Sequence, residues 1–244
     1  MDEHFLERTK LLLGESVMKQ LASTKVILFG IGGVGSWCAE SLIRSGVHHL
    51  TLVDMDKVDE TNINRQLLAT RDTIGEIKVE VLKNRLLAIN PKAKITPIYQ
   101  RYTLQKNNDF NLPSYDYIID AIDSIEDKFN LLIQSANKTD AVVFSSMGAA
   151  LKINPLLIKS TEFWKVSGCP LAASLRRKFR KEKISLKKSI QCVYSDEKII
   201  PTEGVSFSYL EGERRINGTL AHITAIFGFH LAGLLIQDIV NKSQ

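Results

Sequence analysis

The stretch KVILFGIGGVG, residues 25–35, decides how this 244-residue chain is expected to fold. It begins with five β-favouring residues and runs directly into a glycine-rich turn, after which residues 35–45 have the pattern of a helix. The glycines of the turn are Gly30, Gly32, Gly33 and Gly35. Glycines between a strand and a helix let the backbone approach a phosphate, and the helix N-terminus adds free N–H groups. The stretch therefore predicts a Rossmann-like nucleotide-binding motif.

Strands and helices continue to alternate after this motif. We expect strands at residues 49–56, 94–99, 115–122 and 141–146, and helices at 78–90 and 219–240. Such alternation is typical of an α/β fold with a mostly parallel sheet flanked by helices, here as a single domain over residues 1–244.

Two regions depart from the alternation. Residues 1–22 are expected to form an N-terminal helical segment broken at Gly14. Residues 160–215 lose the rhythm of strands and helices, so we expect a basic, irregular and partly mobile insertion in the C-terminal half.

A carboxylate and a polar cluster follow the second expected strand. Asp54 stands about 20 residues after the glycine turn, where a carboxylate can hold ribose hydroxyls. That much would also suit NAD. The polar residues that come next, and that we assign to nucleotide binding, include Asp56, Asn62, Arg65 and Gln66. A triphosphate brings roughly four negative charges that cations and a metal must meet, whereas a dehydrogenase needs no such cluster, so ATP is favoured.

Lys78 and two aspartates complete the candidate site. Lys78 stands near the start of an expected helix and can supply a second cation beside Arg65. Asp120 and Asp123 lie where the strand at 115–122 ends. Ligands of open α/β sheets bind at the carboxyl ends of strands, so a carboxylate there can hold Mg²⁺ against the phosphates.

Four segments of the chain together resemble the adenylation domain of the ThiF/MoeB superfamily, whose members join AMP to a carboxylate. They are GIGGVGSWCAESLIRSGV (30–47), LVDMDKVDETNINRQLLA (52–69), GEIKVEVLKNRLLAINP (75–91) and DAIDS (120–124). The resemblance implies that the glycine turn and Asp54 hold the adenosine and its ribose. It also implies that Asn62, Arg65 and Lys78 contact the phosphates. Asp123 would bind Mg²⁺.

The N-terminal stretch FLERTKLLLG, residues 5–14, resembles the N-terminal segment of the same superfamily. There an arginine reaches the ATP of a partner subunit. The resemblance implies that Arg8 does so here, and that the protein is a homodimer.

The second half of the chain resembles one branch of the superfamily, the bacterial enzymes that dehydrate threonylcarbamoyladenosine in tRNA. The resemblance rests on PLAASLRRKFRK (170–181), CVYSDEK (192–198) and GTLAHITAIFGFHLAGLLIQDIV (218–240). It implies ATP-dependent cyclisation of N6-threonylcarbamoyladenosine through an AMP-activated carboxylate. Two alternatives stay open: an adenylyltransferase that activates the C-terminal Gly-Gly of a sulfur-carrier protein, and an inactive nucleotide-binding partner subunit.

The three cysteines, Cys38, Cys169 and Cys192, are far apart and form no C-x-x-C pair. We therefore expect no zinc site, and the sparse cysteines favour a reducing cytoplasm. Cys38 and Cys192 are expected to be packed in the interior, and Cys169 to lie in a loop. Ring closure within one modified base needs no protein thiol, because effective molarities of roughly 10⁵ M or more are typical of such reactions. A sulfur-relay protein is a further partner suggested by the family.

The positive charge of the chain is concentrated in one place. Between Arg176 and Lys188 there are eight Lys and Arg residues and one acid, Glu182, although the net charge of the whole chain is only +5. A local patch of this kind indicates an anionic partner. We expect Arg176, Arg177, Lys178 and Arg180 to contact the tRNA backbone.

The C-terminal apolar run from Leu220 to Ile236 contains two histidines and is shorter than a membrane span of about 20 residues. We expect it to be a helix of the core or of a dimer interface, without membrane association.

Overall fold

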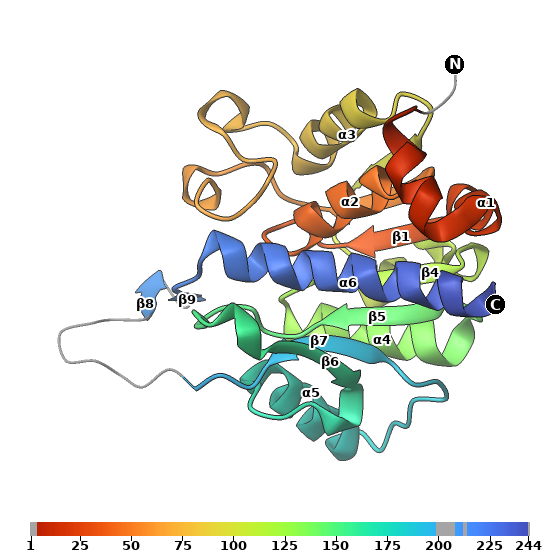
Figure 1. The fold of residues 1–244 in the computed structure, drawn as a ribbon. Helices are drawn as coiled ribbons and strands as arrows, with labels where there is room; N and C mark the ends of the chain where they lie inside the picture. The colour runs from red at the N-terminus through yellow and green to blue at the C-terminus, as the bar shows by residue number, and fades with distance from the viewer. Residues whose placement is uncertain (1–3, 199–207, 212–213, 244) are drawn as a thin grey trace.

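The computed structural model describes residues 4–198, 208–211 and 214–243. Its centre is a seven-stranded sheet in the order β3-β2-β1-β4-β5-β7-β6 (Figure 1). All neighbouring pairs are parallel except β6–β7, which is antiparallel. The strands are β1 (Lys25–Phe29), β2 (His49–Asp54), β3 (Lys94–Tyr99), β4 (Tyr117–Asp120), β5 (Val142–Ser146), β6 (Ile158–Glu162) and β7 (Gln191–Ser195). A separate hairpin joins β8 (Ser208–Glu211) to β9 (Arg214–Asn217).

Six α-helices lie within the described residues: α1 (Glu7–Ser23), α2 (Gly35–Arg44), α3 (Lys78–Ile89), α4 (Ile125–Lys138), α5 (Pro170–Lys181) and α6 (Ala221–Lys242). Short 3₁₀ turns lie between them: η1 (His4–Leu6), η2 (Glu60–Asn62), η3 (Arg71–Thr73), η4 (Leu104–Phe110), η5 (Leu112–Ser114), η6 (Pro155–Leu157) and η7 (Phe163–Lys165). The predicted α/β fold with a mostly parallel sheet is confirmed, although the strand expected at 49–56 ends at Asp54 and the one expected at 115–122 is reduced to Tyr117–Asp120.

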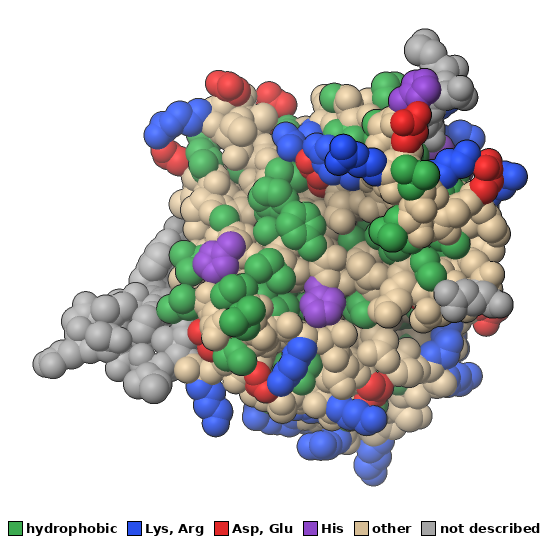
Figure 2. Space-filling model, in the orientation of Figure 1, with side chains coloured by type: hydrophobic (Ala, Val, Ile, Leu, Met, Phe, Trp, Pro, Cys, Tyr) green, Lys and Arg blue, Asp and Glu red, His purple; other side chains and the backbone are tan. Residues whose placement is uncertain are grey.

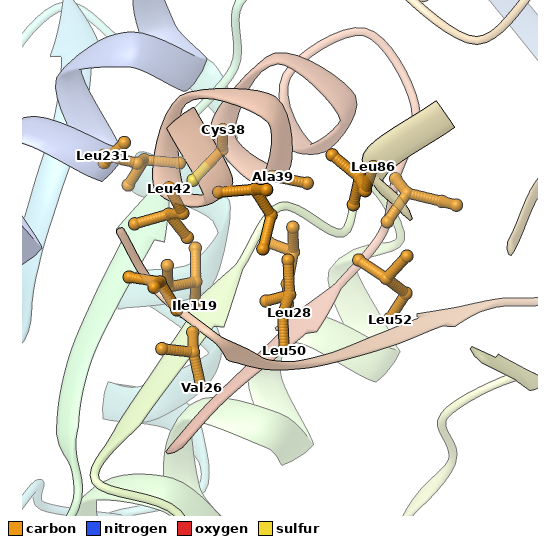
Figure 3. Packing of buried hydrophobic residues seen from close by; sticks show 14 of the residues in the cluster. Val26, Leu28, Cys38, Ala39, Leu42, Leu50, Leu52, Leu86, Ile119 and Leu231 are labelled. Carbon is orange, nitrogen blue, oxygen red and sulfur yellow. The ribbon is translucent and has the colours of Figure 1, made fainter. Parts of the chain in front are cut away.

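Helices cover both faces of the sheet, because side chains of a strand point alternately to opposite faces. Val26 and Leu28 of β1 belong to the cluster with α1, α2, α3 and α6, whereas Ile27 and Phe29 belong to the cluster with Leu131 of α4. Figure 3 shows the first cluster, with Leu28 and Leu52 of the sheet under α2 and α3. A strand buried on both faces needs a continuous apolar run, which is what KVILF provides.

The longest helix, α6, lies directly against α2. A Cβ at Gly228 would come within 2.4 Å of the Val34 carbonyl oxygen and 2.8 Å of the Cys38 nitrogen. Only glycine permits this approach. Among the described residues α6 is also the one helix long and apolar enough to cross a membrane by length and composition, and half of its apolar window is buried against the protein. Its buried side chains fit the expectation of a core helix.

The structure of residues 160–215 differs from the prediction. The irregular insertion expected there is wrong for its first part, because β6, α5 and β7 are regular and β7 pairs with β5 inside the main sheet. The apolar side chains of α5 and β7 complete a second core cluster with α4, a tertiary effect that local patterns do not reveal. Residues 199–207 and 212–213 of the expected insertion lie outside the described part of the chain. The predicted break at Gly14 is confirmed by its φ of 79° inside α1.

Candidate nucleotide site

The glycine turn lies where the strand order reverses between β1 and β4, the place where open α/β sheets bind ligands. Two of its glycines are required by close backbone contacts. A Cβ at Gly30, where φ is +80°, would meet the Ala121 oxygen at 2.7 Å, and one at Gly35 would meet the Gly30 oxygen at 1.9 Å. The turn is therefore folded tightly against the segment that follows β4.

Asp54, at the end of β2, ties the second strand to the glycine turn. Its carboxylate accepts hydrogen bonds from the Ile31 and Asp56 backbone N–H groups, both at 2.9 Å. Burial raises the pKa of Asp54, and the nearby Lys78 charge opposes that shift. The geometry holds a partly buried carboxylate beside the phosphate-binding turn, where it was expected to meet the ribose.

Lys78 and Asp56 form an ion pair beside this carboxylate. The Lys78 Nζ lies 2.8 Å from Asp56 Oδ2, and the Lys78 side chain is only 5% exposed whereas that of Asp56 is 52% exposed. Lys78 is the first residue of α3. The fold thus brings the candidate phosphate-binding lysine from α3 to the segment after β2.

The segment after β2 folds on its own polar side chains. Asn62 is buried and its Oδ1 accepts from the Asp59 backbone N–H at 3.2 Å. The Arg65 Nη1 donates to the Thr61 carbonyl oxygen at 2.8 Å and to Asn64 Oδ1 at 2.9 Å. These bonds hold the guanidinium close to its own backbone, and they account for the amides in the sequence motif.

Gln66 is buried beside the glycine turn. Its Nε2 lies 3.5 Å from where a Cβ of Gly32 would be, and its Oε1 has no hydrogen-bond partner in the described part of the chain. A buried amide oxygen without a partner is costly, which makes Gln66 a candidate for ligand contact.

The two aspartates after β4 have different environments. Asp123 is exposed in the turn before α4. Asp120 is completely buried and bonded to Lys128 and Ser145. Asp120 is thus occupied by the protein, and Asp123 is the carboxylate at the surface of the site. Sequence reasoning missed Lys128, although a lysine inside the apolar face of a helix was a visible signal.

Fit to a metal can be judged from the donors present. No group of three or more His, Cys, Asp and Glu side chains that could hold a metal occurs in residues 4–198, 208–211 and 214–243. Mg²⁺ commonly binds through one or two carboxylates together with substrate phosphates, so a single Asp123 fits an ion brought by ATP. These residues likewise contain no cluster of thiolates that could hold zinc.

Arg8 is not brought to the nucleotide site of its own chain. It is exposed on the first turn of α1, and the neighbouring Leu6 packs beside Gly46, which follows the last residue of α2. The glycine turn precedes the first residue of α2, and ten helical residues span about 15 Å. Arg8 therefore lies near the opposite end of α2 from the nucleotide site.

The basic residues of α5 divide into two groups. Lys178 pairs with Glu126 at 2.9 Å and Glu182 at 2.8 Å, and Arg176 donates to the Phe163 carbonyl oxygen at 3.3 Å. Arg177 and Arg180 are exposed. On the opposite face, Leu175 and Phe179 are buried in the second core cluster.

All three cysteines are buried. Burial raises the pKa of the Cys38 and Cys192 thiols far above the ordinary range. Because the thiolate is the reactive form, neither is prepared to act as a nucleophile. The expectation that Cys38 and Cys192 are packed residues is confirmed, and Cys169 lies just before α5 as expected.

The surface clefts do not mark this site. One, of about 300 Å³, is lined by residues from Leu67 to Arg85, and another, of about 470 Å³, lies at the N-terminal edge of the sheet around Tyr117. Neither includes a residue of the glycine turn, Asp54 or Asp123. We identify the site from its backbone donors and charges, which converge at one edge of the sheet.

Comparisons with known proteins find relatives and solved structures that are similar over nearly the whole chain. The chain is 36% identical to the tRNA threonylcarbamoyladenosine dehydratase of Bacillus subtilis, over 97% of this chain and 95% of the relative. It is similar to the crystal structure of the Escherichia coli dehydratase TcdA in complex with AMP, with a TM-score of 0.87 and 32% identity over 99% and 97% of the two chains. The same enzyme in complex with ATP gives a TM-score of 0.85 at 32% identity, again over 99% and 97% of the two chains. The sulfur carrier protein adenylyltransferase of Thermus thermophilus is 31% identical, but over only 48% of this chain and 43% of the relative.

The model of the ThiF family matches residues 6–243, nearly the whole chain. Together with the shared fold and the full-length relatives, this match shows that the chain belongs to the ThiF family.

Proposed function

We propose that this protein is an ATP-dependent tRNA threonylcarbamoyladenosine dehydratase. The observation that carries the proposal is the extent of the similarity. A dehydratase matches 97% of the chain, including α5 and α6, whereas a sulfur-carrier adenylyltransferase matches only 48%. The similarity to the dehydratase therefore extends over both halves of the chain, whereas the similarity to the adenylyltransferase covers about one half of its length.

The proposed chemistry begins with the carboxylate of N6-threonylcarbamoyladenosine. One of its oxygens attacks the α-phosphorus of ATP, and pyrophosphate leaves. A nucleophile on the same modified base then attacks the activated carbonyl carbon, loses its proton and expels AMP. The net result is removal of the elements of water, and a ring closes within one base. Buried, protonated thiols are consistent with this route, because closure needs no enzyme nucleophile.

The nucleotide is held by residues that follow β1 and β2, together with Lys78 of α3. The glycine turn offers backbone N–H groups to the phosphates, and Asp54 is placed beside it for the ribose hydroxyls. Arg65 and Lys78 supply the positive charge, with Asn62, Gln66 and Asp56 next to them. Both cations already have protein partners, and we propose that phosphate oxygens replace them when ATP binds.

Asp123 would hold a Mg²⁺ ion that accompanies ATP, and such an ion would neutralise charge on the phosphates. The position of Asp123 supports this role. Asp123 is exposed, and the Ala121 oxygen of the same turn lies against Gly30 of the glycine turn.

The tRNA lies along α5. Lys178 bonds to Glu126, which is three residues beyond Asp123, so this helix packs beside the turn that carries the metal ligand. Arg177 and Arg180 are free of the core and face solvent, where they can meet phosphates. Arg176 and Lys178 contribute charge from positions that the protein already uses.

The protein is a homodimer, in which Arg8 acts on the partner's ATP. Arg8, Leu11 and Leu12 are spaced as one face of a helix, and the two leucines are 87% and 82% exposed. Hydrophobic side chains also gather over α6 on the face drawn in Figure 2. The exposed apolar residues of the protein include Ile153, Leu156 and Phe229. Such apolar surface is typical of a subunit interface. A cytoplasmic location and a sulfur-relay partner stay predictions from the sequence.

One experiment separates the proposed function from its main rival. The protein is incubated with ATP and either tRNA that carries threonylcarbamoyladenosine or a carrier protein ending in Gly-Gly. We expect AMP release with the tRNA alone. Release of AMP with the carrier and none with the tRNA would assign the protein to the adenylyltransferases. No release with either would favour an inactive partner subunit.

A further inference from the structure

A row of polar side chains crosses the otherwise apolar interior of the sheet. Asp120 of β4 is in register with Ser145 of β5, and Ser145 is in register with Cys192 of β7. Residues in register on parallel strands point to the same face, which here is covered by α4. Lys128 of α4 reaches this row, and its side chain and that of Asp120 are both 0% exposed.

Asp120 connects this row to the chain beyond β4. Its Oδ2 accepts from Lys128 Nζ at 2.5 Å and from Ser145 Oγ at 2.7 Å. Its Oδ1 accepts from the backbone N–H of Ile122 at 3.0 Å. One carboxylate thus joins two core side chains to the backbone of the turn at residues 121–124.

The same turn is held on two further sides. The Ala121 oxygen lies against Gly30, so closely that a Cβ there would approach it to 2.7 Å. At its end, Ser124 caps α4 through the Asp127 backbone N–H. Asp123 lies between these fixed points. A buried ion pair is weak support for stability, because apolar residues of similar volume often stabilise as well. The position of the pair under this turn therefore needs another reason.

We propose that Asp120, Lys128 and Ser145 form a positioning cluster that fixes the turn carrying Asp123 against the glycine turn. This inference rests on the proposed function, because it takes Asp123 as the carboxylate that meets the metal of Mg·ATP. The cluster touches neither nucleotide nor metal. It acts through the backbone of residues 121–124, and it sets how well Asp123 is aligned before ATP arrives.

The test compares metal-dependent with metal-free nucleotide binding. Binding of Mn²⁺·ATP is measured by the electron paramagnetic resonance of the ion, and binding of ATP in EDTA by calorimetry. The main variant is Asp120→Leu/Lys128→Met, which removes both charges together and leaves no unpaired buried ion. We expect its Mn²⁺·ATP affinity to fall about 10-fold or more, as for other residues that orient a metal ligand, while ATP binding in EDTA stays unchanged.

Two further variants keep the test decisive. Ser145→Ala retains the ion pair and should give a smaller loss, about 3-fold, so it decides the matter if the double variant does not fold. Tyr117→Phe removes a hydrogen bond to Asp238 at the other end of β4 and should leave the ratio of the two affinities unchanged. Folded variants of the cluster that keep the wild-type ratio would overturn the inference alone. If the wild-type protein itself gains nothing from the metal, the metal role of Asp123 fails, and the inference fails with it.

Discussion

The positive charge of the candidate nucleotide site comes from Lys78 and Arg65. Lys78 is nearly buried, yet its partner Asp56 is half exposed, so water weakens their attraction. The Arg65 guanidinium donates to the neutral oxygens of Thr61 and Asn64. A phosphate group offers stronger, charge-assisted hydrogen bonds than either. Both residues are therefore prepared to exchange partners when a triphosphate binds.

Asp123→Asn should slow the reaction more than it weakens nucleotide binding. The amide keeps the shape of the side chain but removes the charge that holds Mg²⁺, and the loss falls where charge moves between phosphates. We expect cyclised nucleoside per tRNA, measured by mass spectrometry of digests, to form about 10²-fold more slowly. No adenylate should accumulate, because the defect precedes it. A variant that cyclises at the wild-type rate would remove Asp123 from the mechanism.

Cys192→Ser should leave ring closure largely intact. Cys192 is fully buried, and burial raises the pKa of its thiol, so the thiolate is suppressed. Serine at this site can cost about 1 kcal/mol or more of stability, because a hydroxyl is being buried. The same mass spectrometric assay should nevertheless show cyclisation per folded protein near the wild-type level. A folded but inactive serine variant would require a covalent thiol route instead.

The helix α5 contributes both to the core and to the charged surface of the protein. In α5 a buried apolar face completes the core beside α4, while the opposite face carries the basic residues. Lys178 lies between these faces and forms ion pairs with Glu126 of α4 and with Glu182. An acidic residue in place of Lys178 would therefore put three acids together. Variants that probe the surface of α5 should therefore leave Lys178 in place.

Arg177→Glu/Arg180→Glu should weaken tRNA binding and flatten its salt dependence, while ATP binding stays intact. Each lost phosphate contact should reduce the slope of log affinity against log salt by about 0.7–0.9. The measurement is tRNA affinity at several salt concentrations. Lys19→Glu/Lys94→Glu, an equal change of charge at exposed positions on α1 and β3, is the matched control. If both double variants weakened tRNA binding equally, the net charge of the protein would explain the effect, and α5 would have no specific role in binding.

Gly228→Ala and Gly233→Ala, both in α6, should change stability in opposite directions. The new Cβ at Gly228 would collide with Val34 and Cys38 of the neighbouring helix, costing about 1–3 kcal/mol. At Gly233 nothing lies within 4 Å, so alanine should stabilise the helix by about 0.5–1 kcal/mol. Thermal melting should show about 2–4 °C per kcal/mol for a chain of this size. A harmless alanine at Gly228 would contradict the close approach of α6 to α2.

For the whole molecule, the first 150 residues follow from the sequence far better than the rest. The sequence motifs predict where each nucleotide-site residue lies relative to the strands. The structure brings these residues to one edge of the sheet: the glycine turn, Asp54, Lys78 and Asp123. The contribution of β7 depends on pairing with β5, and the bond between Asp120 and Ser145 depends on the register of β4 with β5. Both are contacts between distant segments, which local periodicity does not report.

The arrangement of subunits gives the last prediction, because Arg8 lies away from its own nucleotide site and beside two exposed leucines. Arg8→Ala and Asp123→Asn should each lose most of the activity when tested alone. Mixed under conditions that exchange subunits, they should recover about a quarter of wild-type activity, since half of the dimers are mixed and each has one intact site. Recovery arises only if Arg8 acts on the partner's ATP. With Arg8 acting within its own chain, both sites of a mixed dimer would stay defective and the mixture would remain inactive. Leu11→Glu/Leu12→Glu is the companion variant, which should be monomeric by light scattering and should abolish the recovery when introduced into both chains.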